Sequence, residues 1–317
     1  MVDVGCAGLL VEDCFCGPLS ALPQEGTLTV LEDMPVRPGG CAANVAIDLA
    51  RQGVSAEVAG CVGKDSAADV LREAFAASGV GASRVVELPG HATSRTVILL
   101  VDGQDRRYLH TVGANRAFAV THIPRGWVAS LKVFYLGGLF GLAGVDPREL
   151  AELLQFCRSA GVTTVLDVVA PQNAAGMEAL RTVLPWVDVF LPNEDEARDL
   201  TKLTSPHDQL HLLAAAGAGT VIITRGGAGC IAQRDGRTYS CGAYRVETRD
   251  PSGSGDAFTS GVIASLLAGR DLPGTLQYAS AIGASATRAL GTTDSVFSAA
   301  EACAFVAEHP LTVIESA

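Results

Sequence analysis

The chain has 317 residues, enough for one large α/β domain or two modest ones. Apolar residues make up 48% and charged residues 18%, which excludes a disordered protein, and no apolar run is long enough to span a membrane. The net charge is −11, so we expect no nucleic-acid partner and no membrane-surface partner, although backbone N–H groups can still bind a small anion.

Nine cysteines are scattered along the chain. An odd number without paired spacing fits reduced thiols and a cytoplasmic location better than a disulfide framework. The first ten residues lack a basic segment and predict a buried strand rather than a signal peptide. Cys14 and Cys16 form the one close pair, and we expect them to be packing residues because no second pair has zinc-ligand spacing.

Two stretches of the amino-terminal half, residues 19–38 and 93–112, are extended and alternating, with Gly, Pro and Asp-Gly turns. They predict either a small antiparallel sheet that projects from the main body as a lid, or edge strands of the main sheet. The pattern alone leaves both alternatives open. In the first case, the lid is formed by about residues 13–38 and 91–115.

The middle of the chain alternates between strand-like and helix-like segments. Runs rich in Val, Ile and Leu predict strands, and apolar residues at three- and four-residue spacing predict helices between them. Strands are expected at 132–136, 162–168, 187–191 and 219–224, and helices at 147–160, 194–203 and 209–216. This order predicts an α/β fold in which helices cover both faces of a mostly parallel sheet.

The last third, residues 255–307, is helical in pattern, with breaks at 269–271 and 291–294. The sequence has no internal repeat, low-complexity tract or Pro/Ser-rich linker. We therefore expect residues 1–317 to form a single domain, with the lid attached to it.

The strongest local motif runs from Asp250 to Asp256 and reads Asp-Pro-Ser-Gly-Ser-Gly-Asp, just before a long Ala-rich helix. Backbone N–H groups of Gly253, Ser254 and Gly255 would converge at the helix N-terminus, where the helix dipole favours an anion such as phosphate. Asp256 would be ionised in the first turn and able to accept a proton from a nearby hydroxyl. An acid at this position is also explained by helix capping alone.

A second glycine-rich turn lies nearer the amino end. Gly39 and Gly40 precede an apolar helix, and Asn44 falls within its first turns. The amide of Asn44 can bind ligand hydroxyls, although this segment alone favours a hydrogen bond at the helix end. The run from Gly60 to Asp65 follows at the end of the next expected strand.

Together, the Gly39–Asn44, Gly60–Asp65 and Asp250–Asp256 motifs resemble those of the ribokinase-like (PfkB-type) carbohydrate kinases in order and spacing, over nearly the whole chain. The resemblance implies a three-layer ribokinase-like fold, in which helices flank the central sheet and a small β-sheet forms a lid. It also implies an ATP-dependent kinase that transfers the γ-phosphoryl group to a hydroxyl of a small sugar, with Mg²⁺ as cofactor, and we expect that hydroxyl to be a primary one.

The resemblance assigns the acceptor sugar to Asp13, Gly39, Gly40 and Asn44. Asp13 would end the first strand and bind sugar hydroxyls. We prefer it to Glu12, because in this family the acid that ends the first strand contacts the sugar, and a carboxylate can accept two hydroxyl hydrogens at once. Catalysis would fall to Asp256 as base, with Gly253, Ser254 and Gly255 supplying N–H groups.

For the nucleotide, the resemblance implies contacts with Asn193, Glu196, Thr224, Gly226, Gly229 and Ser280. Glu196 would act on Mg²⁺ through bound water, and a monovalent cation, K⁺, would bind near Asp250, Ser252 and Ser295. From the residues alone, Glu196 is a solvated acid in the first turn of a helix, and the Gly-rich run after Thr224 is an ordinary hairpin turn.

The sequence departs from the family pattern in four places: Cys41 replaces a usual Lys of ribokinases, Ala67 and Ala68 replace a Gly, Pro251 replaces a Thr, and Ser280 replaces an Asn. The Gly-Ser-Gly-Asp core is intact. The departures therefore put ribose specificity and the adenine contacts in question more than phosphoryl transfer.

In the implied mechanism, Asp256 takes the hydroxyl proton, N–H groups of the helix start stabilise the transferred group, and lid closure excludes water. A nucleoside kinase of adenosine type is the alternative within the family, but aromatic residues make up only 5% and offer few stacking partners for a base. The sequence lacks the glycine motifs of dinucleotide-dependent dehydrogenases and of P-loop enzymes, which argues against both classes. The third class of function considered is a noncatalytic sugar-binding relative of the kinases.

The edge of the lid could pair with a second copy of the chain to form a homodimer.

Overall fold

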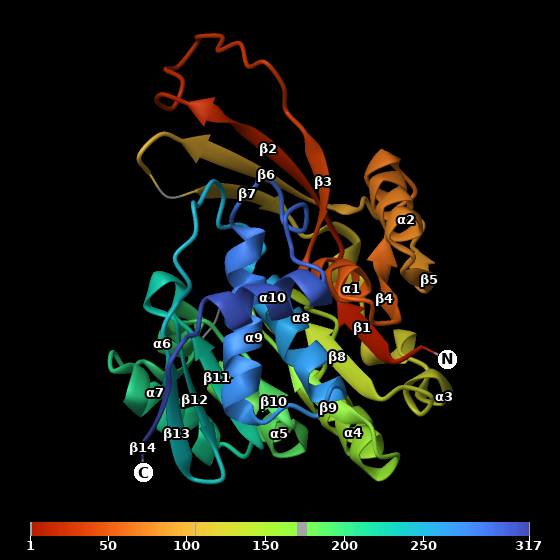
Figure 1. Cartoon of the computed structure of the whole chain (residues 1–317). Helices are drawn as coiled ribbons and strands as arrows, with labels where there is room; N and C mark the ends of the chain where they lie inside the picture. Colours follow the sequence, from red (N-terminus) through yellow and green to blue (C-terminus); the bar gives the residue numbers. More distant parts are fainter. Residues whose placement is uncertain (1, 105, 170–175, 317) are drawn as a thin grey trace.

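The computed structural model of the chain describes residues 2–104, 106–169 and 176–316, and its centre is a ten-stranded sheet (Figure 1). The strand order is β14-β13-β12-β11-β10-β9-β8-β1-β4-β5. Neighbours from β5 to β11 are parallel, and those from β11 to β14 are antiparallel. The bounds are β1 Val4–Gly8, β4 Ala56–Val62, β5 Gly81–Glu87, β8 Val133–Gly137, β9 Thr163–Leu166, β10 Val189–Phe190, β11 Thr220–Thr224, β12 Cys230–Arg234, β13 Arg237–Cys241 and β14 Val313–Ser316.

Helices pack on both faces of this sheet, which confirms the three-layer α/β prediction. One face carries α1 Cys41–Arg51, α2 Ser66–Ser78, α8 Ser254–Leu267, α9 Leu272–Ala286 and α10 Ala299–Glu308. The other carries α3 Arg125–Val128, α4 Pro147–Ser159, α5 Gly176–Val183, α6 Glu194–Thr201 and α7 Pro206–Ala215. The predicted helices and strands of the middle and last thirds all form, with ends shifted by a few residues.

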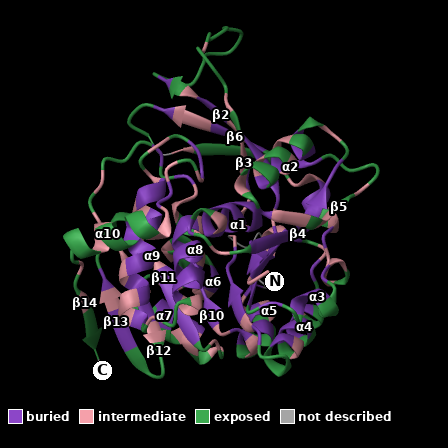
Figure 2. Ribbon diagram, turned by 45° about the vertical axis from the view of Figure 1, so that its right-hand side comes forward, coloured by how far each residue is buried: buried purple, intermediate pink, exposed green. Residues whose placement is uncertain are grey.

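The two apolar cores follow from the alternation of side chains along buried strands. In β8, Val133 and Tyr135 join the core beneath α1 and α8, whereas Phe134 and Leu136 join the core beneath α4. A strand buried on both faces must be apolar throughout, as these central runs are. Figure 2 shows the buried residues gathered in the middle of the main body.

Helix α8 is deeply packed, because every residue from Ala257 to Ser265 is buried. Gly261 allows α9 to approach closely, since a Cβ there would lie 2.7 Å from the Cα of Ala279. This packing fixes the helix axis. The N-terminus of α8 is therefore held in one place beside α1, against which α8 also packs.

A separate four-stranded sheet projects from the main body (Figure 1). Its order is β3-β2-β6-β7, with β2 Val11–Leu19, β3 Val36–Gly39, β6 Ser94–Val101 and β7 Arg107–Thr111. The alternative of edge strands on the main sheet is therefore wrong. The expected antiparallel pairing is wrong for the central pair: β2 and β6 are parallel, because both leave the main body in the same direction. Residues 20–35 contain no strand.

Two side chains fix the points where β2 and β6 leave the body. The Asn115 amide accepts from the Leu10 N–H (3.2 Å) and donates to the Leu10 carbonyl (2.9 Å). The Asp65 carboxylate accepts from the Thr93 N–H at 2.8 Å and from its hydroxyl at 2.6 Å, while also capping α2. The Gly60–Asp65 motif thus holds the base of the small sheet.

All nine cysteines are free thiols, as the sequence predicts. In the described part of the chain, no helix has the length and apolar character needed to cross a membrane.

Candidate functional site

The start of α8 has the geometry of an anion site. The helix begins after Gly253, whose φ of +74° is a left-handed conformation that favours glycine. A Cβ at this position would lie 2.3 Å from the Thr292 carbonyl oxygen, so no larger residue fits. N–H groups in the first helical turn have no acceptor within the helix, and the dipole is positive there. Ser254, Gly255 and Asp256 occupy this turn and line a cavity.

Asp256 is linked to the opposite end of the chain by a hydrogen bond. Its Oδ2 accepts from Nδ2 of Asn44 at 2.7 Å. The Thr292 hydroxyl can donate to the Asn44 Oδ1 at 2.9 Å, and the Pro38 carbonyl oxygen at 3.0 Å is a second acceptor within its reach. Burial raises the pKa of Asp256, and hydrogen bonds from Asn44 and Cys41 act in the opposite direction.

Asp13 lies in β2 of the small sheet, not at the end of the first strand as expected, because the first strand stops at Gly8. Its carboxylate packs so closely against Gly39 that a Cβ there would lie 2.0 Å from Oδ2. Burial, with the charges of Asp256 and Asp250 adding to it, raises the pKa of Asp13 to about 6. Glu12 instead forms an ion pair with Arg95 at 3.1 Å, so Asp13 is the acid available to a ligand.

Gly40 precedes α1 with a φ of +88°, and a Cβ there would lie 2.5 Å from the Leu9 carbonyl oxygen. The predicted Gly-Gly turn therefore depends on glycine for steric reasons. It delivers the chain from β3 into the first turn of α1, where Cys41 and Asn44 point toward α8.

A cavity of about 640 Å³ extends from Asp256 along α9 to the β11–β12 turn. It is lined by every residue that the sequence assigns to nucleotide binding, namely Asn193, Glu196, Thr224, Gly226, Gly229 and Ser280. Residues from the start of α8 close one end. Asp13, Gly39 and Gly40 are not part of this lining: Asp13 and Gly39 lie in β2 and β3 of the small sheet, and Gly40 follows β3.

Glu196 caps a helix and also lines the cavity. Its Oε2 accepts from the Asn193 N–H at 2.8 Å, and the Asn193 side chain accepts from the Glu196 N–H at 2.8 Å, which forms a capping box at the start of α6. The same carboxylate also lines the cavity. Burial, together with the charge of Asp256, raises the pKa of Glu196 to about 7. The structural role and a role in the cavity are therefore compatible.

The sequence reasoning missed Asp167, which follows β9 and is almost fully buried. The Asp167 carboxylate accepts hydrogen bonds from the Tyr135 hydroxyl and, at 2.5 Å, from the Gly138 N–H. Burial and the charge of Asp256 raise the pKa of Asp167 well above its usual range. A usable signal existed, since an acid directly after an apolar parallel strand lies at the carboxyl edge of the sheet, where ligands bind.

Arg106 was also missed. It lies on the β6–β7 loop of the small sheet, and its Nη1 donates to the Ser252 hydroxyl at 3.0 Å. Among the described residues that line the cavity, it is the single Lys or Arg, facing the acids Asp167, Asp195, Glu196 and Asp256. No local pattern in the sequence indicates that this loop reaches α8.

The expected monovalent-cation residues are only partly together. The Asp250 carboxylate accepts from the Ser252 N–H (3.0 Å) and hydroxyl (2.7 Å), and from the Gly291 N–H (3.2 Å). Ser295 instead donates to a carbonyl oxygen at the end of α9, with those of Ser285 and Ala286 both within reach. The grouping of Ser295 with Asp250 and Ser252 is therefore not supported by its hydrogen bonds.

Comparisons with known proteins agree with this architecture. A family model described as "pfkB family carbohydrate kinase" matches residues 8–299. The chain is 27% identical to a ribokinase of Haemophilus influenzae, covering 86% of this chain and 87% of that protein. It is 26% identical to a nucleoside kinase of Methanothermobacter thermautotrophicus, covering 90% and 89%. A putative ribokinase II of E. coli, solved with ATP and Mg²⁺, matches 98% of this chain and 100% of its own, with a TM-score of 0.80 and 22% identity.

Proposed function

Because the chain belongs to the PfkB family of carbohydrate kinases, we propose that it transfers the γ-phosphoryl group of ATP to a primary hydroxyl of a small sugar. The observation that carries this proposal is the Asn44–Asp256 hydrogen bond at the start of α8. It ties Asp256, which lines the cavity, to the helix that follows the Gly39–Gly40 turn, and the buried Asp13 packs against this turn. A phosphate donor in the cavity and an alcohol near Asp13 would meet at the Asp256 carboxylate.

Asp256 acts as the general base that takes the proton of the acceptor hydroxyl. The bond from Asn44 orients the carboxylate and favours its ionised form, while burial removes water that would compete for the proton. N–H groups of Gly253, Ser254, Gly255 and Asp256 stabilise charge that develops on the transferred group. Asn44 has a second amide hydrogen available to the acceptor.

Mg²⁺ suits this cavity because its lining supplies hard oxygen donors. The carboxylates of Asp167, Asp195, Glu196 and Asp256 line it, and they would repel the phosphates of ATP without a cation. Glu196 would hold Mg²⁺ through water. When bound, the ion neutralises and aligns phosphate oxygens for transfer.

The small sheet acts as a lid over the reacting groups. Arg106 already reaches from its β6–β7 loop to Ser252, beside the phosphate-binding turn. Its charge would bind phosphate oxygens when ATP is present. Closure of this sheet over the acceptor would exclude water, which otherwise competes as a nucleophile.

The acceptor binds between Asp13, Gly39, Gly40 and Asn44. Asp13 is buried and faces Gly39, so its carboxylate can accept hydroxyl hydrogens in a shielded position. A nucleoside is the second candidate acceptor, because the nucleoside kinase relative matches the chain as extensively as the ribokinase does. Either acceptor presents a hydroxyl to Asp256.

An ADP-release assay over sugars and nucleosides with Mg²⁺ tests the proposal. We expect ATP consumption that depends on one sugar acceptor. Turnover with nucleosides alone would select the second candidate. If no acceptor stimulates ADP release above the level of ATP alone, the proposed phosphoryl transfer is wrong.

Three further properties accompany this function. We propose activation by K⁺ near the buried Asp250 carboxylate, which the same assay checks by comparing K⁺ with Na⁺. The nine free thiols support a reducing, cytoplasmic location. A homodimer through the small sheet is supported by exposed apolar side chains on the loop between β2 and β3, among them Leu28 (89% exposed) and Val30 (84%). Sedimentation should show a dimer that Leu28→Asp with Val30→Asp converts to monomers.

A further inference from the structure

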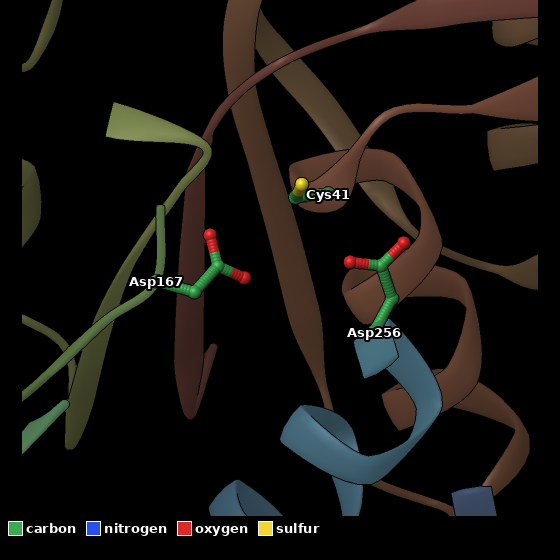
Figure 3. Close-up of side chains that lie close together, drawn as sticks. All are labelled: Cys41, Asp167 and Asp256. Atoms are coloured by element: carbon green, nitrogen blue, oxygen red, sulfur yellow. The ribbon is translucent and has the colours of Figure 1, made fainter. Parts of the chain in front are cut away.

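Cys41 brings a thiol to the reacting centre. It is the first residue of α1, directly after the Gly39-Gly40 turn, and it lines the cavity. Its sulfur and one carboxylate oxygen each of Asp167 and Asp256 lie within 4.8 Å of one another. Figure 3 shows the three side chains pointing toward a common space, from α1, from the end of β9 and from the start of α8.

We propose that Cys41, Asp167 and Asp256 form a binding site for a thiophilic divalent cation of the Zn²⁺ class, and that this cation blocks the kinase. The inhibitory part rests on the function proposed above, whereas the binding part does not. The thiol loses its proton to solvent as the sulfur–metal bond forms, and water completes the coordination.

The donor geometry fits zinc. Bonds of about 2.0–2.3 Å place the donors of a tetrahedral ion about 3.3–3.5 Å apart, so these atoms need to approach by at most about 1.5 Å. Three protein ligands with a water is the common arrangement of zinc sites that are open to solvent. The cavity gives the ion a path to the site and room for that water.

The surroundings of the carboxylates also resemble those of metal ligands. Asp167 is held by the Tyr135 hydroxyl and the Gly138 N–H, and Asp256 is held by Asn44. Such hydrogen bonds orient ligating carboxylates and leave further lone pairs for an ion. The ligand set therefore needs little ordering before it binds.

The thiol decides which cation is preferred. Mg²⁺ takes oxygen ligands and keeps its waters, whereas a thiolate strongly favours Zn²⁺ and related ions. An ion held by Asp256 would occupy the carboxylate that must accept the hydroxyl proton. Zn²⁺ would therefore stop turnover at concentrations far below those of Mg²⁺.

Binding is tested without turnover by titrating Co²⁺ into reduced, metal-free full-length protein with no ATP or sugar. Cobalt bound by a thiolate gives a near-ultraviolet charge-transfer band, and added Zn²⁺ should remove it by displacing the cobalt. We expect the band in the native protein and its loss in Cys41→Ala. Cys41→Ser, which keeps the size of the side chain, should weaken Zn²⁺ binding at least about tenfold. Asp167→Asn should keep the band and weaken the affinity by a similar factor.

Cys14→Ala and Cys303→Ala are the matched controls, because these thiols are also accessible to solvent. Both should keep the band. Absence of the band in the native protein, its persistence in Cys41→Ala, or its loss in either control would overturn the site. Melting curves identify any variant that fails to fold. If Cys41→Ala does not fold, Zn²⁺ binding to Cys41→Ser decides whether the thiol is a ligand.

Inhibition is measured separately, with Mg²⁺ and ATP in excess. Zn²⁺ should inhibit the native enzyme at least about tenfold more strongly than Cys41→Ser. Equal inhibition of the two proteins would overturn the inhibitory role. A protein that shows the cobalt band but no acceptor-dependent ADP release would refute the proposed kinase activity and leave the metal site standing.

Discussion

Asn44 and Asp256, 212 positions apart in the chain, share a hydrogen bond of 2.7 Å at the meeting point of α1 and α8. The bond exists because α8 is held rigidly by α9 and the sheet, while Gly39 and Gly40 direct the chain into α1. It joins Asp256, which lines the cavity, to the helix that follows the Gly39–Gly40 turn, where Asp13 packs against Gly39. Both residues can be tested separately.

Asp256→Asn removes the base and preserves the size of the side chain. We expect turnover to fall by roughly 10²–10⁴, because the proton of the acceptor hydroxyl loses its acceptor. Sugar and ATP binding, measured by calorimetry, should change little. Asp235→Asn is the matched control, since Asp235 is exposed and its φ of +51° suits Asn. Turnover of Asp256→Asn equal to that of the control would contradict the base assignment.

Asn44→Ala should change the pH dependence of turnover as well as its size. The bond from Asn44 lowers the pKa of Asp256, so its loss raises that pKa. A base works only in its ionised form, and the acidic limb of the pH profile should therefore move to higher pH. Thr292→Val, which removes one hydrogen bond to the Asn44 amide, should move the limb in the same direction but less. A limb that stays in place or moves to lower pH would show that Asn44 does not tune Asp256.

Arg106→Ala tests the contact between the small sheet and the nucleotide. A hydrogen bond from a charged group contributes about 1.5–3 kcal/mol, so the KM for MgATP should rise roughly 10- to 100-fold. Arg106→Lys should recover part of this loss, because the charge remains. The neighbouring Arg107 is exposed and hydrogen-bonded to Gln104, and Arg107→Ala should leave the KM unchanged. Equal KM values for the two alanine variants would exclude a role of Arg106 at the phosphates.

The start of α8 could be predicted from the sequence because its geometry is local. Gly253 precedes a long apolar helix, and the N–H groups of the first turn follow from helix geometry alone. The crossover helices of the middle third are predictable for the same reason, since each carries its own apolar spacing. These elements match the structure because the residues that determine them are close together in the sequence.

The rest of the site depends on contacts between distant segments. Arg106 reaches Ser252 because β2 and β6 pair in parallel, and no spacing within either strand encodes that pairing. Asp167 lies near Cys41 because β9 and the start of α1 both lie against β8. Ser295 reaches the carbonyl groups at the end of α9 because its loop folds back onto that helix, a contact that no spacing in the loop encodes. Contacts of this kind can be predicted only when the order of the strands in the sheet is known.

Asp48 provides the last prediction, which concerns stability. It lies on α1 one turn after Asn44, is fully buried, and both its carboxylate oxygens have no hydrogen-bond partner in the described chain. Burial, with the charge of Asp256, raises the pKa of Asp48 well above its usual range. The folded state therefore binds more protons than the unfolded state above about pH 4, and this residue lowers stability increasingly as pH rises. Asp48→Ala should stabilise the protein by about 1–3 kcal/mol near pH 7 in urea unfolding, with a smaller gain near pH 4.

Asp65→Ala is the contrasting variant, and it should lower the free energy of unfolding. Hydrogen bonds from Thr93 and Ala68 outweigh burial and lower the pKa of Asp65. A native protein more stable than Asp48→Ala near pH 7 would mean that Asp48 has a partner that offsets its burial.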